Sequence, residues 1–428
     1  MNSAIHGGLR DRPARRYSGA MTRILLLIPS RTYRTADFLE AASALDIEVV
    51  VGVEERPALA DVMGERWLAL SLTDVASGRQ AIVDYAQEHS LDAVVPIDDG
   101  STLVAAAAAA ALGLPHNRFG AVAASRDKAR TRELLSTAGL NTPHFRTWPA
   151  DADPEEVPSP TFPVVVKPVD LSGSRGVIRA DDPDELAGAF ARVAAIVRSP
   201  DVCPPGEEPQ RILVEDFIPG VEGAVEGLLR GGHLEVLAIF DKPDPLVGPY
   251  FEETIYVTPS RLPAETQSLV EATAAAATRA IGLTEGPIHA ELRLNEGGAW
   301  VLEVAARSIG GLCARTLHFG AGVPLEELII RHAAGLPLPS LEREHAAAGV
   351  MMLPIPRAGT LREVNGRAEA IAVPGIEGLV ITIPPGGRVV PLPEGDRYLG
   401  FMFARAETPA EAEAALREAH RRLEIVIE

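Results

Sequence analysis

The sequence predicts a mixed protein in which an α/β part comes first, an α+β part follows and a β-rich part ends the chain. Three observations support this prediction. Apolar runs alternate with helical stretches near the N-terminus, proline-rich loops separate strands and helices in the middle, and glycine and proline turns divide short strands near the C-terminus. A length of 428 residues with 46% hydrophobic residues suits two to four domains.

Residues 21–120 are predicted to form an open α/β domain. Continuous apolar runs that alternate with helices are typical of buried parallel strands. Strands are expected at 23–30, 47–53 and 92–98, and helices at 37–46, 80–89 and, as an alanine run, 105–111. Residues 1–20 are polar and rich in Arg, so we expect a disordered extension there, with Met21 as a candidate start.

Residues 121–345 are expected to form a second domain with two lobes, 121–208 and 209–345. Proline and acidic residues mark two exposed loops, at 149–163 and 199–210. Strands are expected at 163–169, 211–218, 235–242, 288–294 and 299–304, and helices at 184–198, 264–281 and 324–335. Residues 346–428 form the predicted β-rich domain, which closes with a helix at 409–421 and a strand at 423–428.

The charge balance excludes two classes of partner. With 59 acidic and 40 basic residues the net charge is −19, which argues against nucleic acid or an anionic membrane as the main partner. No apolar run approaches the roughly 18 residues that a membrane helix needs. Cys203 and Cys313 lie far apart without a CxxC pair, so we expect no disulfide framework, no zinc site and a cytoplasmic location.

Lysine is rare in this chain and therefore informative. Of the 40 basic residues only Lys128, Lys167 and Lys242 are lysines. Where Arg has replaced Lys almost everywhere, the remaining lysines are expected at positions that a guanidinium does not fit.

The loop 170–177 (DLSGSRGV) follows the strand that carries Lys167. Its closely spaced Gly and Ser residues allow backbone N–H groups to converge on an anion such as a phosphate, and a simple hairpin turn is the alternative. Lys167 favours the phosphate interpretation, because a lysine in an apolar strand needs an anionic partner. A lysine that reaches solvent at the strand end is the alternative for Lys167, and a solvated helix face is the alternative for Lys128.

Acidic residues follow next, in the segment from Glu215 to Glu226. Glu215, Glu222 and Glu226 can accept hydrogen bonds from ribose hydroxyls or an amino group, and Phe217 and Ile218 can offer apolar walls to a flat base. Solvent-facing strand positions are the alternative for these carboxylates.

The strands HAELRL and AWVLEV give the strongest local signal. If the connection spans 295–299, Glu291 lies opposite Glu303, His289 opposite Ala305 and Arg293 opposite Val301. Two facing carboxylates repel, so a cation is expected between them, and Mg²⁺ or Mn²⁺ suits carboxylates that share it with phosphate oxygens. The alternative is a structural ion pair with Arg293 or Arg307.

Two further features remain. Gly310 and Gly311 directly after Arg307 would let backbone N–H groups approach a ligand. Lys242 precedes Glu252 and Glu253, which makes a surface ion pair one interpretation and a role at the ligand the other.

In this order, DKxxxRxLL at 127–135, VVVKP at 164–168, SGSRGV at 172–177, VEDFIPGVE at 214–222, HAELRL at 289–294 and LEVAARSIGG at 302–311 resemble the ATP-grasp superfamily. Within it the chain is similar to single-chain carboxylate–amine ligases of the L-amino acid ligase type. The resemblance runs from about residue 23 to residue 427, and it implies an ATP-grasp fold with an N-terminal open α/β domain and a β-rich C-terminal domain.

The resemblance implies roles for individual residues. Lys128 and Lys167 would contact ATP phosphates under a mobile loop that includes Ser172, Gly173, Ser174 and Gly176. Glu215, Phe217 and Ile218 would line the adenine, Glu222 would bind ribose, Glu291 and Glu303 would hold Mg²⁺ (or Mn²⁺), and Arg307 would contact the transferring phosphate. Many relatives have Asn where this chain has Ala305, which leaves the number of metal ions open.

The implied activity is ATP-dependent amide or peptide bond formation through an acyl phosphate, with small-molecule carboxylate and amine substrates and an amino acid among them. A bicarbonate-activating carboxylase-type enzyme and a nucleotide-binding protein without turnover are the alternatives. Candidate substrate contacts are Lys242, Glu253, Arg307, Gly310, Gly311, Arg315 and His318, and a homodimer is one candidate assembly.

Overall fold

The computed structural model describes residues 21–58, 60–153, 161–204 and 206–428. The predicted extension 1–20 lies outside the described residues, as do parts of the predicted loops 149–163 and 199–210. Within the described residues, no helix has the length and the apolar character needed to cross a membrane.

The N-terminal part is the expected open α/β domain. Its four strands are all parallel, in the order β3 (Trp67–Ala69), β2 (Glu48–Val53), β1 (Arg23–Leu27) and β4 (Ala93–Pro96). The helices are α1 (Thr35–Ala44), α2 (Ala60–Met63), α3 (Val75–Glu88) and α4 (Asp99–Leu112), the last of which contains the alanine run. Strand β1 lies between β2 and β4, so the loops after β1 and β4 open side by side at the carboxyl edge of the sheet, where α/β sheets bind ligands.

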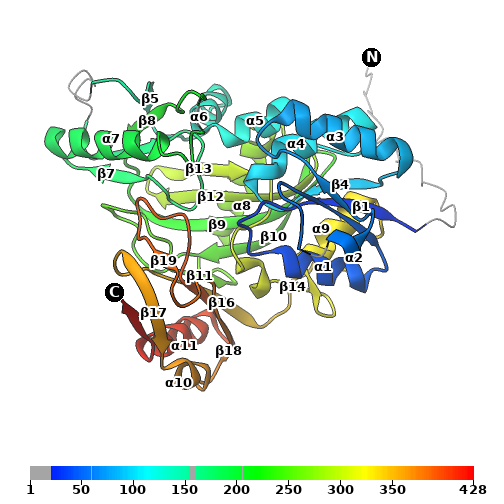
Figure 1. The fold of residues 1–428 in the computed structure, drawn as a ribbon. Coiled ribbons are helices and arrows are strands. Elements are labelled where there is room, and N and C mark those ends of the chain that lie inside the picture. Colours follow the sequence, from blue (N-terminus) through cyan, green and yellow to red (C-terminus); the bar gives the residue numbers. More distant parts are fainter. Residues whose placement is uncertain (1–20, 59, 154–160, 205) are drawn as a thin grey trace, which may run out of the picture.

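A small antiparallel sheet forms the next layer, near the helix α7 in Figure 1. Its strands are β5 (Phe145–Trp148), β8 (Ile212–Asp216), β6 (Val164–Pro168) and β7 (Ile178–Ala180). Helix α7 (Pro183–Val197) covers one face; Asp182 caps it by accepting a hydrogen bond from the backbone N–H of Glu185, and Pro183 occupies the first turn. Helices α5 (Phe119–Arg126) and α6 (Lys128–Thr137) connect this sheet to the N-terminal domain.

An eight-stranded sheet organises the rest of the chain. Its order is β13 (Gly298–Ala305), β12 (Gly286–Asn295), β9 (Val221–Arg230), β10 (His233–Asp241), β11 (Ile255–Thr258), β16 (Ala347–Leu353), β20 (Gly400–Ala406) and β18 (Ile376–Ile381). The sheet therefore contains strands from both sides of residue 346. Helix α8 (Ala264–Ile281) packs against β13 and β10, and α11 (Pro409–Arg421) packs against β16 and β20.

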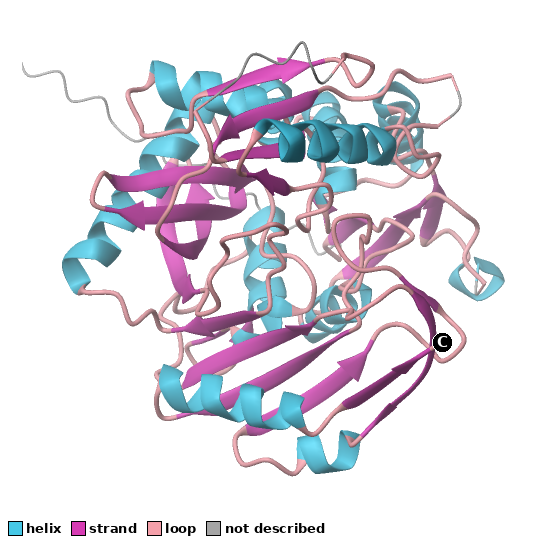
Figure 2. Cartoon of the chain, turned by 90° about the vertical axis from the view of Figure 1, so that its left-hand side faces the viewer, coloured by secondary structure: helices cyan, strands magenta, loops and turns pink. Residues whose placement is uncertain are grey.

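The remaining elements join these layers. Helix α9 (Leu325–Ala334) shares a hydrophobic core with α1 and with strands of the N-terminal sheet. Short pairs and single elements complete the chain: β14 (His318–Phe319), β15 (Val323–Pro324), β17 (Gly359–Asn365), α10 (Arg367–Ile371), β19 (Arg388–Val389) and β21 (Glu424–Ile427). Figure 2 shows the strands near the C-terminus as a layer with helices on its outer side.

Candidate active site

A cleft of about 340 Å³ lies where the N-terminal domain, the small antiparallel sheet, the eight-stranded sheet and a C-terminal loop meet. Its lining includes Asp99, Lys167, Glu291 and Asp396, one from each of these parts. Most of the predicted site residues line it: Lys128, Lys167, Ser172, Gly173, Ser174, Glu215, Phe217, Ile218, Glu222, Glu253, Glu291, Glu303, Arg307, Gly310 and Gly311. Residues spread over more than 180 positions of the sequence thus share one cavity.

Lys167 of β6 is buried beside Glu215 of the neighbouring strand β8. Its Nζ lies 2.5 Å from Glu215 Oε1, and Arg132 of α6 donates to both oxygens of the same carboxylate at 2.9 and 3.2 Å. Burial alone would raise the pKa of Glu215, but Arg132 and Lys167 lower it to about 2. The alternative of a solvent-reaching Lys167 is wrong, because only 7% of the residue is exposed.

Lys128 begins α6 and is 6% exposed, so the solvated helix face is also wrong for this residue. Its Nζ donates to the carbonyl of Leu171 at 2.6 Å and lies 3.3 Å from Glu303 Oε2. Lys128 therefore connects the glycine loop with a carboxylate on β13.

The glycine loop connects the antiparallel strands β6 and β7, so it is also a hairpin connection. Gly173, Ser174 and Gly176 have positive φ angles of 63°, 56° and 74°. The N–H of Gly176 donates to the carbonyl of Pro393 at 2.9 Å, which ties the loop to the C-terminal segment. A Cβ on Gly176 would lie 2.9 Å from Pro168, so only Gly fits there.

Aromatic rings line the cleft next to Ile218. The rings of Phe217 and Phe251 stack with centroids 6.2 Å apart, and the guanidinium of Arg293 lies 4.9 Å from the Phe217 centroid. Arg293 also donates to the carbonyl of Ile218 at 2.7 Å and to Glu222 Oε2 at 2.8 Å. A flat apolar surface therefore adjoins a carboxylate that a buried Arg holds in place.

The facing glutamates are confirmed: Glu291 of β12 pairs with Glu303 of β13, and His289 with Ala305. The predicted pairing of Arg293 with Val301 is wrong, because a bulge after Glu291 shifts the register and places Arg293 opposite Trp300.

The alternative ion pairs for these glutamates are wrong as well. Arg293 and Arg307 make their ion pairs with Glu222 and Asp99, whereas Glu291 contacts His289 and Lys242.

Lys242 does pair with Glu253, but it is 5% exposed, so the interpretation of a surface ion pair is wrong about its location. Its Nζ lies 2.8 Å from Glu222 Oε1 and 3.5 Å from Glu291 Oε1, and it also contacts Glu253. Among the described residues, Glu222, Glu253 and Glu291 form a group whose possible metal-ligand atoms lie within 4.8 Å of one another, and Glu303 is not part of it. The ammonium of Lys242 thus neutralises part of this group.

Buried Glu226 of β9 lies behind the cleft and is 0% exposed, so the solvent-facing alternative is wrong for it. Its Oε2 accepts a hydrogen bond from the backbone N–H of Ile309 at 2.9 Å and lies 3.2 Å from Nδ1 of His289. Although burial opposes protonation, Glu226 and Glu291 raise the pKa of His289 to about 9.

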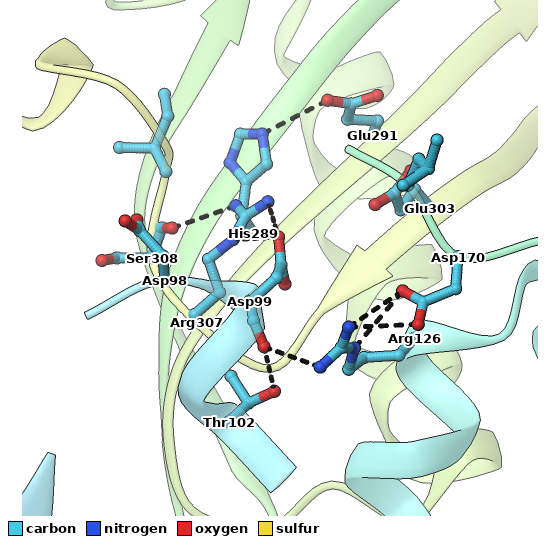
Figure 3. A network of polar contacts seen from close by, with 12 residues as sticks. Asp98, Asp99, Thr102, Arg126, Asp170, His289, Glu291, Glu303, Arg307 and Ser308 are labelled. Carbon is cyan, nitrogen blue, oxygen red and sulfur yellow. Dashed lines mark hydrogen bonds and ion pairs between the residues drawn. The ribbon is translucent and has the colours of Figure 1, made fainter. Parts of the chain in front are cut away.

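Arg307 follows β13 and reaches the N-terminal domain. Its Nε and Nη2 donate to Asp99 Oδ2 at 2.9 and 2.7 Å, and its Nη1 donates to the carbonyl of Ser308 at 3.0 Å. Figure 3 shows this contact beside a second pair, in which Arg126 donates to both oxygens of Asp170. Burial would lower the pKa of Arg307, but the carboxylate of Asp99 raises it above its usual range.

The sequence did not indicate a role for Asp99, which lines the cleft, or for Arg132, which holds Glu215 from behind it. Asp99 comes from another domain, and only its place after β4, at the carboxyl edge of the sheet, could have pointed to it.

Three suggested substrate contacts lie outside the cleft lining: Arg315 pairs with Asp37, His318 contacts Arg405, and Lys242 is buried beneath Glu222 and Glu291. Gly176 of the glycine loop is also outside the lining.

Comparison with known families gives three matches. The ATP-grasp N-terminal domain matches residues 39–116, the ATP-grasp domain matches 160–316, and the L-amino acid ligase C-terminal domain 2 matches 351–428.

Relatives and solved structures agree with these matches. An uncharacterised protein of Sinorhizobium fredii is 25% identical, and the match covers 93% of this chain and 82% of that protein. The alanine–anticapsin ligase of Bacillus subtilis is 26% identical, and the match covers 59% of this chain and 56% of that ligase. The crystal structure of the L-amino acid ligase from Bacillus licheniformis has a TM-score of 0.81 and 29% identity, covering 95% of this chain and 99% of that one. With three consecutive domain matches and this likeness along nearly the whole chain, the protein belongs to the ATP-grasp superfamily and resembles its L-amino acid ligases.

Proposed function

We propose that this protein is an ATP-dependent carboxylate–amine ligase that forms an amide or peptide bond through an acyl phosphate, with an amino acid as one substrate. The observation that carries the proposal is a single cleft that contains two lysines, a glycine loop, two facing glutamates and a buried arginine. Two of the similar proteins named above, the alanine–anticapsin ligase and the L-amino acid ligase, support the same reaction class.

Lys128 and Lys167 are the proposed phosphate contacts. Both are buried cations whose partners are carboxylates, Glu303 and Glu215, and phosphate oxygens offer such cations a further anionic partner. The adenine is proposed to stack beside Phe217 and Ile218, with Glu222 near the ribose. Glu222 is already held by Lys242 and Arg293, so its carboxylate is oriented before nucleotide arrives.

A divalent cation fits Glu291 and Glu303. Their carboxylates face each other across β12 and β13, and oxygen ligands of this kind suit Mg²⁺ or Mn²⁺. When bound, such an ion neutralises negative charge on the phosphates. Ala305 supplies no ligand atom, so we propose that these two residues hold one ion. A metal titration would count the ions that are bound.

The reaction needs no protein nucleophile. A carboxylate oxygen of the acid substrate attacks the γ-phosphorus of ATP, the bond to the β-phosphate oxygen breaks and ADP leaves. The amine nitrogen then attacks the acyl carbon, inorganic phosphate leaves and the nitrogen loses a proton. Arg307 is proposed to hold the transferring phosphoryl group, because its guanidinium lines the cleft and Asp99 fixes its orientation.

The glycine loop is proposed to exclude water from the acyl phosphate. It lines the cleft and its Gly176 is hydrogen bonded to Pro393, so the loop already contacts the C-terminal segment that supplies Asp396 to the cleft. We also propose a cytoplasmic enzyme, since Cys203 and Cys313 are both free thiols.

One experiment tests this function. Purified protein is incubated with ATP, Mg²⁺ and amino acids, singly and in pairs, and phosphate release and hydroxylamine-trapped acyl phosphate are measured. Phosphate release that requires two amino acids, with hydroxamate formed from one of them, supports the ligase. Turnover with bicarbonate alone would favour the carboxylase-type alternative, and ATP binding without turnover on any carboxylate would favour a binding protein.

Light scattering on the same preparation tests for a homodimer.

A further inference from the structure

The ammonium of Lys242 lies among three carboxylates that come from different parts of the chain. Glu222 is on β9, Glu291 is on β12, and Glu253 is in the loop before β11. The distances from Nζ are 2.8 Å to Glu222 and 3.5 Å to Glu291, Glu253 is also in contact, and the lysine side chain is 2% exposed. The steps proposed above use this buried cation only to hold Glu222 and give it no role at Glu291.

The shape of this site explains why the position is a lysine. An ammonium group carries three N–H donors around one atom and can point one at each carboxylate, whereas a guanidinium is a planar fork that suits one carboxylate in a bidentate pair. The chain contains only three lysines among its 40 basic residues, so arginine was the usual choice elsewhere. An arginine does not suit a position where three carboxylates converge on one atom.

His289 approaches the same oxygen of Glu291 as Lys242 does. Its Nε2 lies 3.5 Å from Glu291 Oε1, the atom that is 3.5 Å from Lys242 Nζ. The other ring nitrogen of His289 faces Glu226, which the backbone N–H of Ile309 also holds. Figure 3 shows His289 directed at Glu291. The imidazole ring is therefore fixed from behind while it contacts the glutamate in the cleft.

We propose that Lys242 and His289 are positioning residues, which together hold one oxygen of Glu291 and so orient this carboxylate for a divalent cation. The inference rests on the proposed function, since it takes Glu291 as a cation ligand. Side chains that orient a ligating carboxylate commonly change metal affinity about 10- to 100-fold when they are replaced.

The test measures cation binding instead of turnover. Mn²⁺ binding to the protein–ADP complex is followed by electron paramagnetic resonance for Lys242→Arg, His289→Gln and the double variant. Each single variant should weaken Mn²⁺ binding about tenfold or more. In His289→Gln, whose side chain contacts Glu226 and Glu291 and not Glu222, ADP binding without divalent ions should change less than about twofold. The fold loss of Mn²⁺ affinity in the double variant should be smaller than the product of the two single fold losses, because both residues act on one oxygen.

The matched control is Arg261→Lys, the reverse exchange at a position near the same strand end. Arg261 pairs with Asp241, which precedes Lys242, and its side chain is 40% exposed, so Mn²⁺ binding should not change. Unchanged Mn²⁺ affinity in both single variants would overturn the proposal, as would an equal loss of metal-free ADP binding in His289→Gln. If Lys242→Arg does not fold, as judged by its melting temperature, His289→Gln decides alone. Failure of the ligase assay with intact Mn²⁺ effects would refute the proposed function and leave the positioning role standing.

Discussion

Two guanidinium nitrogens of Arg307 donate to one oxygen of Asp99, although the two residues lie 208 positions apart. Asp99 is in the first turn of α4, in the N-terminal domain, and Arg307 follows the edge strand β13 of the large sheet. Burial would raise the pKa of Asp99, but Arg307, together with Arg126 and Lys128, keeps it below its usual value. The N-terminal domain thus supplies the partner that orients the arginine proposed to contact the phosphoryl group.

Asp99→Asn should lower kcat roughly 10- to 100-fold, because Arg307 loses its charged partner and small displacements of a positioning group are costly. Steady-state phosphate release measures this effect. Asp37→Asn is the control, since Asp37 of the same domain also pairs with an arginine, Arg315, but lies outside the cleft lining and should retain most activity. Equal losses in both variants would mean that overall charge, and not this contact, matters.

Glu303→Ala should abolish Mg²⁺-dependent ADP release and leave the fold intact, because one of two facing carboxylates is removed. ADP release and the far-ultraviolet circular dichroism spectrum are the two measurements. The matched variant is Glu296→Ala, an exposed residue in the turn between the same two strands, which should behave as the wild type. Normal turnover of Glu303→Ala would refute the metal assignment.

Gly176→Ala should raise KM for ATP and reduce kcat, because the new Cβ would lie 2.9 Å from Pro168 at a φ of +74°. Gly173→Ala has a similar φ of +63° but no heavy atom within 4 Å of its Cβ. Comparing ATP kinetics of the two variants separates backbone strain from the clash. Identical kinetics would show that the packing against Pro168 does not hold the loop.

Glu215 should contribute acid-sensitive stability. Its pKa is about 2 in the folded protein against an ordinary value of 4.5, so the stabilisation is fully present above pH 4.5 and is lost as the pH falls towards 2. The contribution is on the order of 3 kcal/mol. Urea unfolding at several pH values should show a shallower loss of stability below pH 5 in Glu215→Gln, which is also less stable at neutral pH because Arg132 and Lys167 lose their partner. Parallel curves for both proteins would contradict this prediction.

Periodicity and motif order predicted the main elements because strands and helices obey local rules. The helix predicted at 264–281 has those bounds in the structure. Glu291 faces Glu303 as predicted, but the predicted connection 295–299 is too long, because Asn295 pairs with Gly298, and the bulge after Glu291 brings the two glutamates opposite each other. The predicted pairing of Arg293 with Val301, on the turn side of Glu291, is wrong because of a bulge. The bulge depends on how β12 and β13 pack and leaves no clear mark in the sequence.

The sequence by itself determined which side chains are proposed to carry the chemistry: the lysines that remain among arginines, the paired glutamates and the glycine loop. Only the tertiary structure decided their partners. Asp99 meets Arg307, Glu226 supports His289, and Lys242 sits inside a group of three glutamates, each through contacts between distant segments. The physical reason is that burial and ionic partners depend on three-dimensional neighbours, whereas residue type and spacing constrain only local backbone geometry.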